Sequence, residues 1–190
     1  AGLAMFELVK SMGLEPKLLY GGLVEHQQNR AMVSVLEIPA RRLILDWEVN
    51  DVLTDAAVVV TVDFHRPGAN NILPDDCVPH IVIDHHASEG VAADLAMGHP
   101  EFSATSSLVA SLLMQLDFEM TPRIATGLAF GIRTDTLGFT RHFNPVDIRA
   151  LSWLNAWVDS EMMRSIEEPP RSMATLDAFS EALNARQQTG

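Results

Sequence analysis

Three side chains that bind metal ions well stand together at the end of an apolar segment. The segment HIVID covers residues 80–84, and Asp84 is followed directly by His85 and His86. A second apolar segment, VVVTVD, ends in Asp63. Carboxylate and imidazole groups that converge form sites for Mn²⁺, Zn²⁺ or Fe²⁺. A carboxylate between two such ions can bridge them, and two bridged ions can hold a hydroxide for attack on phosphorus.

The two apolar segments are the clearest strands of the sequence. Residues 55–64, DAAVVVTVDF, form a β-branched run that is typical of a strand covered on both faces. In a parallel sheet all strands end at the same edge, and ligands bind in the crevice there. We therefore expect Asp63 to meet the group formed by Asp84, His85 and His86.

A third acid lies in the segment GIRTDTLGF, residues 131–139. Asp135 falls in a helical stretch, and an acid inside an apolar segment is costly unless it is paired or bound to a metal. Asp135 is therefore a candidate ligand. It could equally form a structural ion pair with Arg133 or Arg141, and the residues alone leave both interpretations open.

The remaining histidines are weaker candidates. His65, His80, His99 and His142 are each predicted to lie on the surface or in loops. His65 and His142 are close to the acidic segments along the chain, so they stay in reserve as site residues. Asp63 taken alone would be a turn acid after a strand, whereas two adjacent imidazoles at a strand end need partners.

These residues must be positioned by an α/β fold. Strands that alternate with helices predict a parallel sheet flanked by helices, with a helical C-terminal portion from about residue 103. Several of the helices open with a Ser, Thr, Asn or Pro capping signal. We expect strands at 17–22, 42–46, 55–64 and 80–84, and helices at 2–12, 25–38, 103–117, 121–135, 144–159, 160–169 and 173–190.

Composition limits the classes of function. The chain has 190 residues, of which 47% are hydrophobic, a size that fits one globular domain. No apolar run has membrane length, so no membrane span is expected. One cysteine, Cys77, excludes an internal disulfide and is compatible with a cytoplasmic location. A net charge of −12 disfavours non-specific binding of long nucleic acids.

The segments VVVTVD, HIVIDHH and GIRTDTLGF, in this order and spacing, resemble three motifs of the DHH phosphoesterase superfamily. That superfamily includes RecJ-like exonucleases, oligoribonucleases that also dephosphorylate phosphoadenosine phosphate, cyclic-dinucleotide phosphodiesterases and family II pyrophosphatases. The similarity extends to SATSSLVASLL, which resembles the helix after the third motif. The loop RPGANNILP resembles that of exopolyphosphatase-like members. The resemblance implies a DHH catalytic domain with a phosphate-ester hydrolase activity.

The resemblance also implies a role for each residue. Asp63 would bridge two metal ions, and His85 and Asp135 would bind the second ion. Asp84 would orient the site through hydrogen bonds, and His86 would face the scissile phosphate. The expected cofactor is Mn²⁺ in a two-metal site of the complete protein, with Mg²⁺ or Co²⁺ as alternatives.

Substrate contacts are implied less directly. Arg133 and Arg141 are candidates for contact with phosphate. The implied substrates are short single-stranded oligonucleotides, nucleotides or other small phosphate esters, so nucleic acid binding would be limited to short pieces. A homodimer is compatible with the family, and no membrane partner is expected.

The chain departs from the family pattern at both ends. The family's first motif carries a His and two Asp residues after the first strand, and a smaller C-terminal substrate-binding domain carries a glycine-rich stretch followed by His. Neither segment occurs in the sequence. We therefore expect residues 1–168 to be a catalytic domain without its first strand and first motif. Residues 169–190 would be a helix leading to a linker, and the 190 residues alone would hold one ion weakly or none.

Two other functions compete with the enzyme. One is a non-catalytic DHH-type domain that binds a nucleotide or metal as a regulatory module, an interpretation based on the missing first motif. The other is a generic doubly wound nucleotide-binding domain. No glycine-rich phosphate loop follows a strand in the sequence, which counts against the second alternative.

Overall fold

Short parallel strands and packed helices make up the residues that the computed structural model describes, namely 1–66, 71–86, 91–98, 101–170 and 177. The strands are β1 Leu18–Tyr20, β2 Ala40–Arg42, β3 Val60–Val62, β4 Ile81–Ile83 and β5 Leu95–Met97. The helices are α1 Gly2–Ser11, α2 Gln27–Val35, α3 Asp46–Asp55, α4 Thr105–Gln115, α5 Pro122–Asp135, α6 Pro145–Leu154 and α7 Ser160–Glu167.

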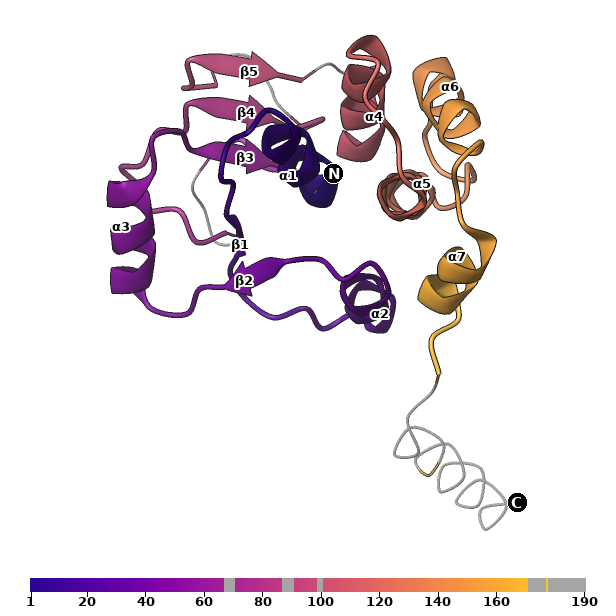
Figure 1. Cartoon of the computed structure of the whole chain (residues 1–190), viewed down its shortest axis with the longest axis horizontal. Helices are drawn as coiled ribbons and strands as arrows, with labels where there is room; N and C mark the ends of the chain where they lie inside the picture. The colour runs from indigo at the N-terminus through magenta and orange to yellow at the C-terminus, as the bar shows by residue number, and fades with distance from the viewer. Residues whose placement is uncertain (67–70, 87–90, 99–100, 171–176, 178–190) are drawn as a thin grey trace, which may run out of the picture.

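The strands form two sheets. β1 pairs with β2, and β3, β4 and β5 pair in that order, with every pairing parallel. Helix α2 supplies the crossover that the parallel strands β1 and β2 require, and α3 connects one sheet to the other. In Figure 1 the arrows of β3, β4 and β5 point toward α4, so the carboxyl ends of these strands face the helical part of the molecule.

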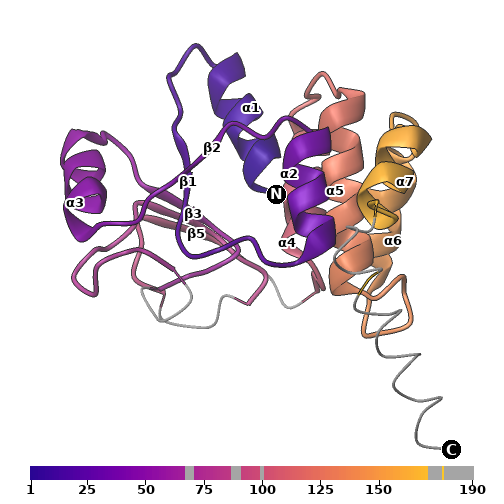
Figure 2. The same ribbon diagram turned by 90° about the horizontal axis from the view of Figure 1, so that it is seen from below.

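The helical part supplies most of the hydrophobic core. α4, α5 and α6 pack against one another, α1 packs against α5, and α2 packs against α7. Figure 2 shows α2, α5 and α7 beside one another from below. Ile83 of β4 belongs to the same core, so the central strand is anchored to the helices next to it. Other fully buried members of this core are Leu113, Leu128, Ile132, Leu154 and Ile166.

α4 and α5 approach closely where each carries a small residue. A Cβ atom on Gly131 would overlap the Oγ and Cβ atoms of Ser106. Glycine at position 131 therefore allows the first turn of α4 to lie directly on α5. The start of α5 is fixed by Thr121, whose hydroxyl accepts a hydrogen bond from the backbone nitrogen of Ile124.

The structure confirms the α/β class with a parallel arrangement and the helices predicted within residues 2–169. It also differs in detail. Helix α3 and strand β5 were not predicted, and β2 lies at 40–42 rather than at 42–46. The strand predicted at 55–64 is reduced to Val60–Val62, and Val60 is 37% exposed, so the expected cover on both faces was wrong. The helix predicted at 173–190 lies outside the described residues, apart from Asp177.

The domain boundaries at 168 and 169 remain a prediction. Within the described part of the chain, no helix combines the length and apolar character that crossing a membrane requires.

Candidate active site

The sheet places two acids at one edge. Asp63 follows β3 directly, and its backbone nitrogen donates to the carbonyl of Ile83 at 2.9 Å. Asp84 follows β4, and its backbone nitrogen donates to the carbonyl of Met97 at 3.0 Å. Each strand ladder thus continues for one residue beyond its strand and fixes the acid. Asp63 has a φ of +74°, a left-handed conformation that few residues other than Gly, Asn and Asp adopt.

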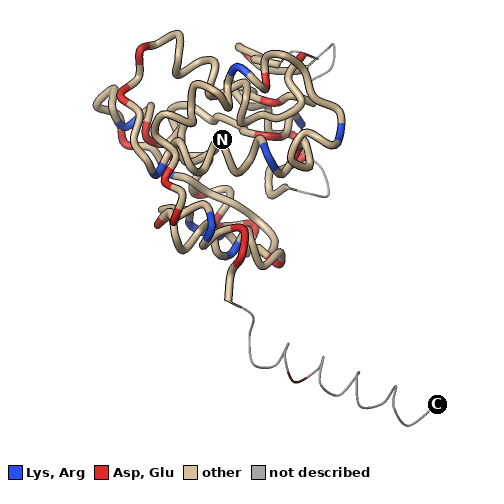
Figure 3. Tube along the Cα trace, turned by 90° about the vertical axis from the view of Figure 1, so that its right-hand side faces the viewer, with Lys and Arg blue, Asp and Glu red and all other residues tan. Residues whose placement is uncertain are grey.

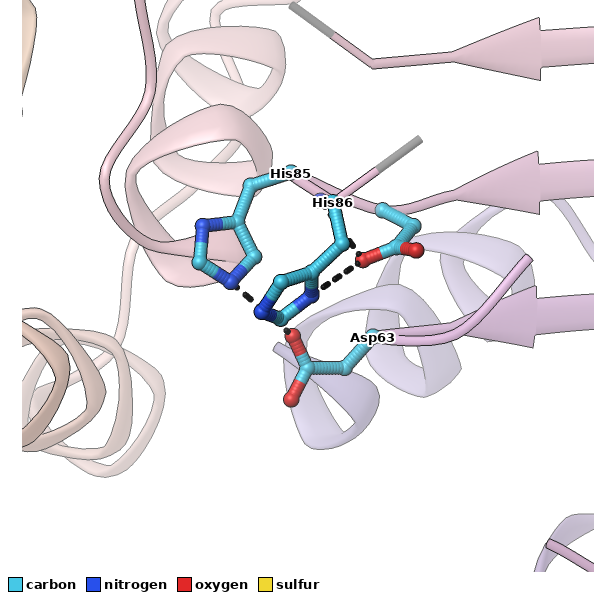
Figure 4. A group of neighbouring side chains, drawn as sticks. Asp63, His85 and His86 are labelled. Atoms are coloured by element: carbon cyan, nitrogen blue, oxygen red, sulfur yellow. Dashed lines mark hydrogen bonds and ion pairs between the residues drawn. The ribbon is translucent and has the colours of Figure 1, made fainter. Parts of the chain in front are cut away.

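Four of the predicted site residues lie together. Asp63, Asp84, His85 and His86 each offer one ligand atom, and these atoms all lie within 4.8 Å of one another. His85 Nε2 is 3.9 Å from Asp63 Oδ1. Figure 4 shows the side chains of Asp63, His85 and His86 converging beyond the strand ends. The expectation that the two strand ends converge is confirmed.

Asp84 lies at the centre of a hydrogen-bond network. Its side chain is completely buried. Oδ1 accepts from the backbone nitrogen of His86 at 3.0 Å and pairs with Nδ1 of the same histidine at 2.9 Å, and Oδ2 pairs with His65 Nδ1 at 2.5 Å. Burial raises the pKa of the Asp84 carboxyl. The hydrogen bonds from His65 and His86 lower this pKa by a larger amount, so it lies below its usual value. Asp84 is therefore an anion whose lone pairs are already engaged.

Thr105, the first residue of α4, connects the two strand ends. Its hydroxyl donates to Asp63 Oδ1 at 2.6 Å and accepts from the backbone nitrogen of His85 at 3.2 Å. The residue is 1% exposed. One buried hydroxyl thus fixes both the Asp63 carboxylate and the backbone that carries His85.

Asp135 is the last residue of α5 and lies outside this four-residue cluster. Burial raises the pKa of Asp135, and the negative charge of Asp63 raises it further, while His85 opposes the shift. The side chain of Asp135 also reaches solvent. These charge effects place Asp135 within electrostatic range of Asp63 and His85.

Neither of the two arginines predicted to bind phosphate forms a described ion pair with the four-residue cluster. Arg133 Nη2 forms an ion pair with Glu167 Oε1 of α7 at 3.0 Å. Arg141 is exposed in the segment after α5. Arg133 therefore pairs with Glu167 and not with Asp135, one of the two interpretations that the sequence left open.

The donor set fits a divalent cation. Two ligand atoms that each lie about 2.1 Å from one ion are separated by roughly 3 to 4 Å, depending on the angle between them. The 3.9 Å between His85 Nε2 and Asp63 Oδ1 lies in this range. Asp63 is 56% exposed, so an ion could reach it from solvent. The negative charge of Asp63 opposes the ionisation of Asp135, so a cation between the two acids would be favoured.

His65 is the site residue that the sequence left in reserve. It lies two residues after Asp63 and contacts Asp84, and its position beside the acid was the only signal that could have identified it. His80 has a structural contact instead, because its Nδ1 accepts from the backbone nitrogen of Val59 at 3.1 Å. His142 is exposed, and His99 lies outside the described residues.

Comparisons with known proteins identify a family and several similar chains. The model of the "DHH family, N-terminal domain" matches residues 4–132. The uncharacterized protein MJ1633 of Methanocaldococcus jannaschii is 29% identical over 188 residues, which are 98% of this chain and 37% of MJ1633. An uncharacterized protein of Mycoplasma pneumoniae, the MG371 homolog, is 38% identical over 58 residues, which are 30% of this chain and 18% of that protein.

A solved structure shares the fold. The crystal structure of an exopolyphosphatase-related protein from Bacteroides fragilis superimposes with a TM-score of 0.59 at 18% sequence identity, covering 97% of this chain and 65% of that chain. The chain therefore spans less than two thirds of the length of each of these relatives.

Proposed function

Because this chain belongs to the DHH family, we propose that it forms part of a metal-dependent phosphoesterase that hydrolyses small phosphate esters. The observation that supports this most directly is the convergence of Asp63, Asp84, His85 and His86 at the carboxyl edge of a parallel sheet. Clusters of this composition suit divalent metals that activate water and polarise phosphoryl oxygens.

In this proposal the residues divide into two groups. Asp63 and His85 hold the metal, together with Asp135 from the end of α5. A divalent ion in this position would act as a Lewis acid on a phosphoryl oxygen and lower the pKa of a water molecule. We propose Mn²⁺ as the ion, with Mg²⁺ or Co²⁺ as alternatives.

The second group acts on the substrate. Asp84 orients the His86 ring by binding its Nδ1, so that Nε2 is left for another partner. His86 is 61% exposed, and as an imidazolium, with Nδ1–H held by Asp84, it would donate its Nε2 proton to an oxygen of the leaving group. Arg141, and Arg133 if it leaves Glu167, would bind phosphate oxygens.

The two sheets suggest where a further strand belongs. Among the described strands, β1 and β3 each have one partner, so each has an open edge. A Cβ atom on Gly21, just after β1, would overlap Ile72, which lies in the segment after β3. The segments that follow β1 and β3 therefore lie close to each other. We propose that a parallel strand outside residues 1–190 lies between β1 and β3 and brings further metal ligands to this edge.

The proposed substrates are small. Acidic residues outnumber basic ones, 25 to 13, and Figure 3 shows them distributed along the described chain. Such a surface repels long polyanions. We therefore propose short single-stranded oligonucleotides, nucleotides or related esters as substrates, bound with the help of a C-terminal substrate-binding domain in the longer protein. A cytoplasmic location and a homodimer are parts of the same proposal.

Hydrolysis assays with the full-length protein test this function. The substrates are bis-p-nitrophenyl phosphate, a dinucleotide, phosphoadenosine phosphate and pyrophosphate, each with Mn²⁺. Asp63→Asn suits the test because asparagine tolerates a positive φ. Asp117→Asn is the matched control, since Asp117 is also an aspartate with positive φ, at 48°, and is exposed.

We expect Asp63→Asn and His85→Gln to lower kcat at least about 100-fold, because even indirect partners of metal ligands cost 10- to 100-fold. Asp117→Asn should retain activity. Full activity of Asp63→Asn would remove this site from the mechanism. Absence of activity on every substrate, with Mn²⁺ bound, would favour a non-catalytic regulatory domain of DHH type.

A further inference from the structure

His65 has a contact that its position in a loop did not predict. The residue comes after β3, outside the two strand ends that carry the cluster, yet its Nδ1 lies 2.5 Å from Asp84 Oδ2. Its side chain is 20% exposed, and that of Asp84 is completely buried. A buried carboxylate needs a partner for each oxygen, and His65 is the partner of Oδ2.

The two oxygens of Asp84 have different partners. Oδ1 binds the backbone nitrogen and the ring Nδ1 of His86, at 3.0 and 2.9 Å, and Oδ2 binds His65. The oxygens of a carboxylate rotate together because the group is planar. A hydrogen bond that fixes Oδ2 therefore also fixes the direction in which Oδ1 meets the His86 ring.

We propose that His65 is a positioning residue that fixes the Asp84 carboxylate and, through it, the tautomer and direction of the His86 ring. With Nδ1–H held by Asp84, the His86 ring presents Nε2 toward the side where Asp63 and His85 lie. This inference rests on the proposed function only in assigning His86 Nε2 a role at the substrate. The relay from His65 through Asp84 to His86 stands on the contacts themselves.

Two substitutions separate this role from simple filling of space. In His65→Asn the amide nitrogen takes approximately the place of Nδ1 and can still donate to Asp84. In His65→Gln the amide nitrogen takes approximately the place of Nε2, so it points away from Asp84. His65→Phe keeps the ring and removes the donor. His26→Asn, on the exposed histidine before α2, is the matched control.

The first measurement needs neither metal nor substrate. Long-range ¹H–¹⁵N NMR of the metal-free, full-length protein reports which ring nitrogen of a histidine carries the proton, and the signals that disappear in His86→Gln identify His86. We expect the Nδ1–H form of His86 in wild type, His65→Asn and His26→Asn. In His65→Phe and His65→Gln we expect a mixture of tautomers. An unchanged His86 pattern in a folded His65→Phe protein would overturn the proposal.

The second measurement separates positioning from general destabilisation. Calorimetric titration gives the Mn²⁺ affinity, and steady-state assays give kcat and KM. We expect His65→Phe to lower kcat by about 10- to 100-fold, as for other residues that support a reacting group, with KM and Mn²⁺ affinity within about threefold of wild type. His65→Asn should recover most of kcat. Equal losses of kcat in the Asn and Phe variants would contradict the inference.

The two arms also distinguish this inference from the proposed function. If the wild-type protein neither binds Mn²⁺ nor hydrolyses any ester, the proposed function fails. The NMR result then still decides whether His65 controls the His86 ring.

Discussion

The hydroxyl of Thr105 joins two strand ends that lie 42 residues before it and 20 residues before it. Thr105→Val has the same shape but lacks the hydroxyl, so the backbone nitrogen of His85 loses its acceptor and Asp63 loses a donor. We expect Mn²⁺ affinity to fall by about 10- to 100-fold and the free energy of unfolding to fall by about 1–3 kcal/mol.

Thr105→Ser is the control because it keeps both hydrogen bonds. Calorimetric titration with Mn²⁺ and urea unfolding measure the two effects. A Val variant that binds Mn²⁺ as tightly as the Ser variant would show that Thr105 has no part in shaping the site.

Glu48 gives a prediction for the dependence of stability on pH. Its carboxylate accepts from the backbone nitrogens of Ile44 and Leu45, and these bonds, with a smaller contribution from Arg41, lower its pKa below 4.5. A pKa that is lower in the folded than in the unfolded chain stabilises the fold above the unfolded pKa, and this stability is lost as the pH falls through the folded pKa. Glu48→Gln should therefore lower Tm at pH 7, and the difference from wild type should shrink below about pH 4.5.

Thermal unfolding followed by circular dichroism across this range checks the prediction. Glu15→Gln, on the exposed glutamate between α1 and β1, is the control and should show little difference at either pH. A deficit in Glu48→Gln that stays constant with pH would rule out ionisation as its cause.

At the level of elements, the contact between α4 and α5 depends on Gly131. Gly131→Ala would push against Ser106 at its Oγ and Cβ atoms, close to the backbone of α4. We expect a loss of about 1–3 kcal/mol in unfolding free energy, the usual range for overpacking. Gly127→Ala is the matched control, because its new methyl group would meet the ends of two flexible side chains, Leu36 at 2.9 Å and Leu3 at 4.0 Å. Urea unfolding should show the larger loss for position 131, and equal losses would contradict the steric explanation.

The elements that the sequence predicted correctly are those with a strong local signal. α5 has a capping threonine, a proline at its start and buried residues at helical spacing, and these features agree with one another. α3 has one buried residue, Val49, and contains Asn, Thr and Asp residues that are weak helix formers. β5 has no β-branched residue and pairs on one side with β4. Its formation therefore depends on a neighbour that is distant in the sequence.

The candidate site shows the same division. Asp63, Asp84, His85 and His86 could be predicted because each follows an apolar strand at the same edge of a parallel sheet. The contributions of His65 and Thr105 could not, because each depends on a contact that forms only in the folded chain. The ion pair between Arg133 and Glu167 likewise joins α5 to α7, and no local pattern indicates it.

For the whole molecule, net charge sets an expectation about salt. The chain carries a net charge of −12, so a longer oligonucleotide is repelled more than a dinucleotide. Raising the salt from about 50 to about 200 mM should therefore raise kcat/KM for a longer oligonucleotide relative to that for a dinucleotide, which is opposite to the trend of proteins that bind nucleic acids through basic surfaces. Steady-state assays at several ionic strengths measure the ratio. A ratio that falls with salt would reveal a basic binding surface elsewhere in the longer protein.

The open edges of β1 and β3 also affect how this chain behaves at high concentration. Unpaired strand edges offer backbone donors and acceptors to any neighbouring chain. Beside the β3 edge, Val58 and Val60 are 54% and 37% exposed, and Leu95, in register with Val60 across β4, is 51% exposed. Polar edges next to apolar side chains are a common origin of aggregation. Residues 1–190 produced alone should therefore self-associate and lose solubility as their concentration rises, whereas a protein that covers these edges should remain dispersed.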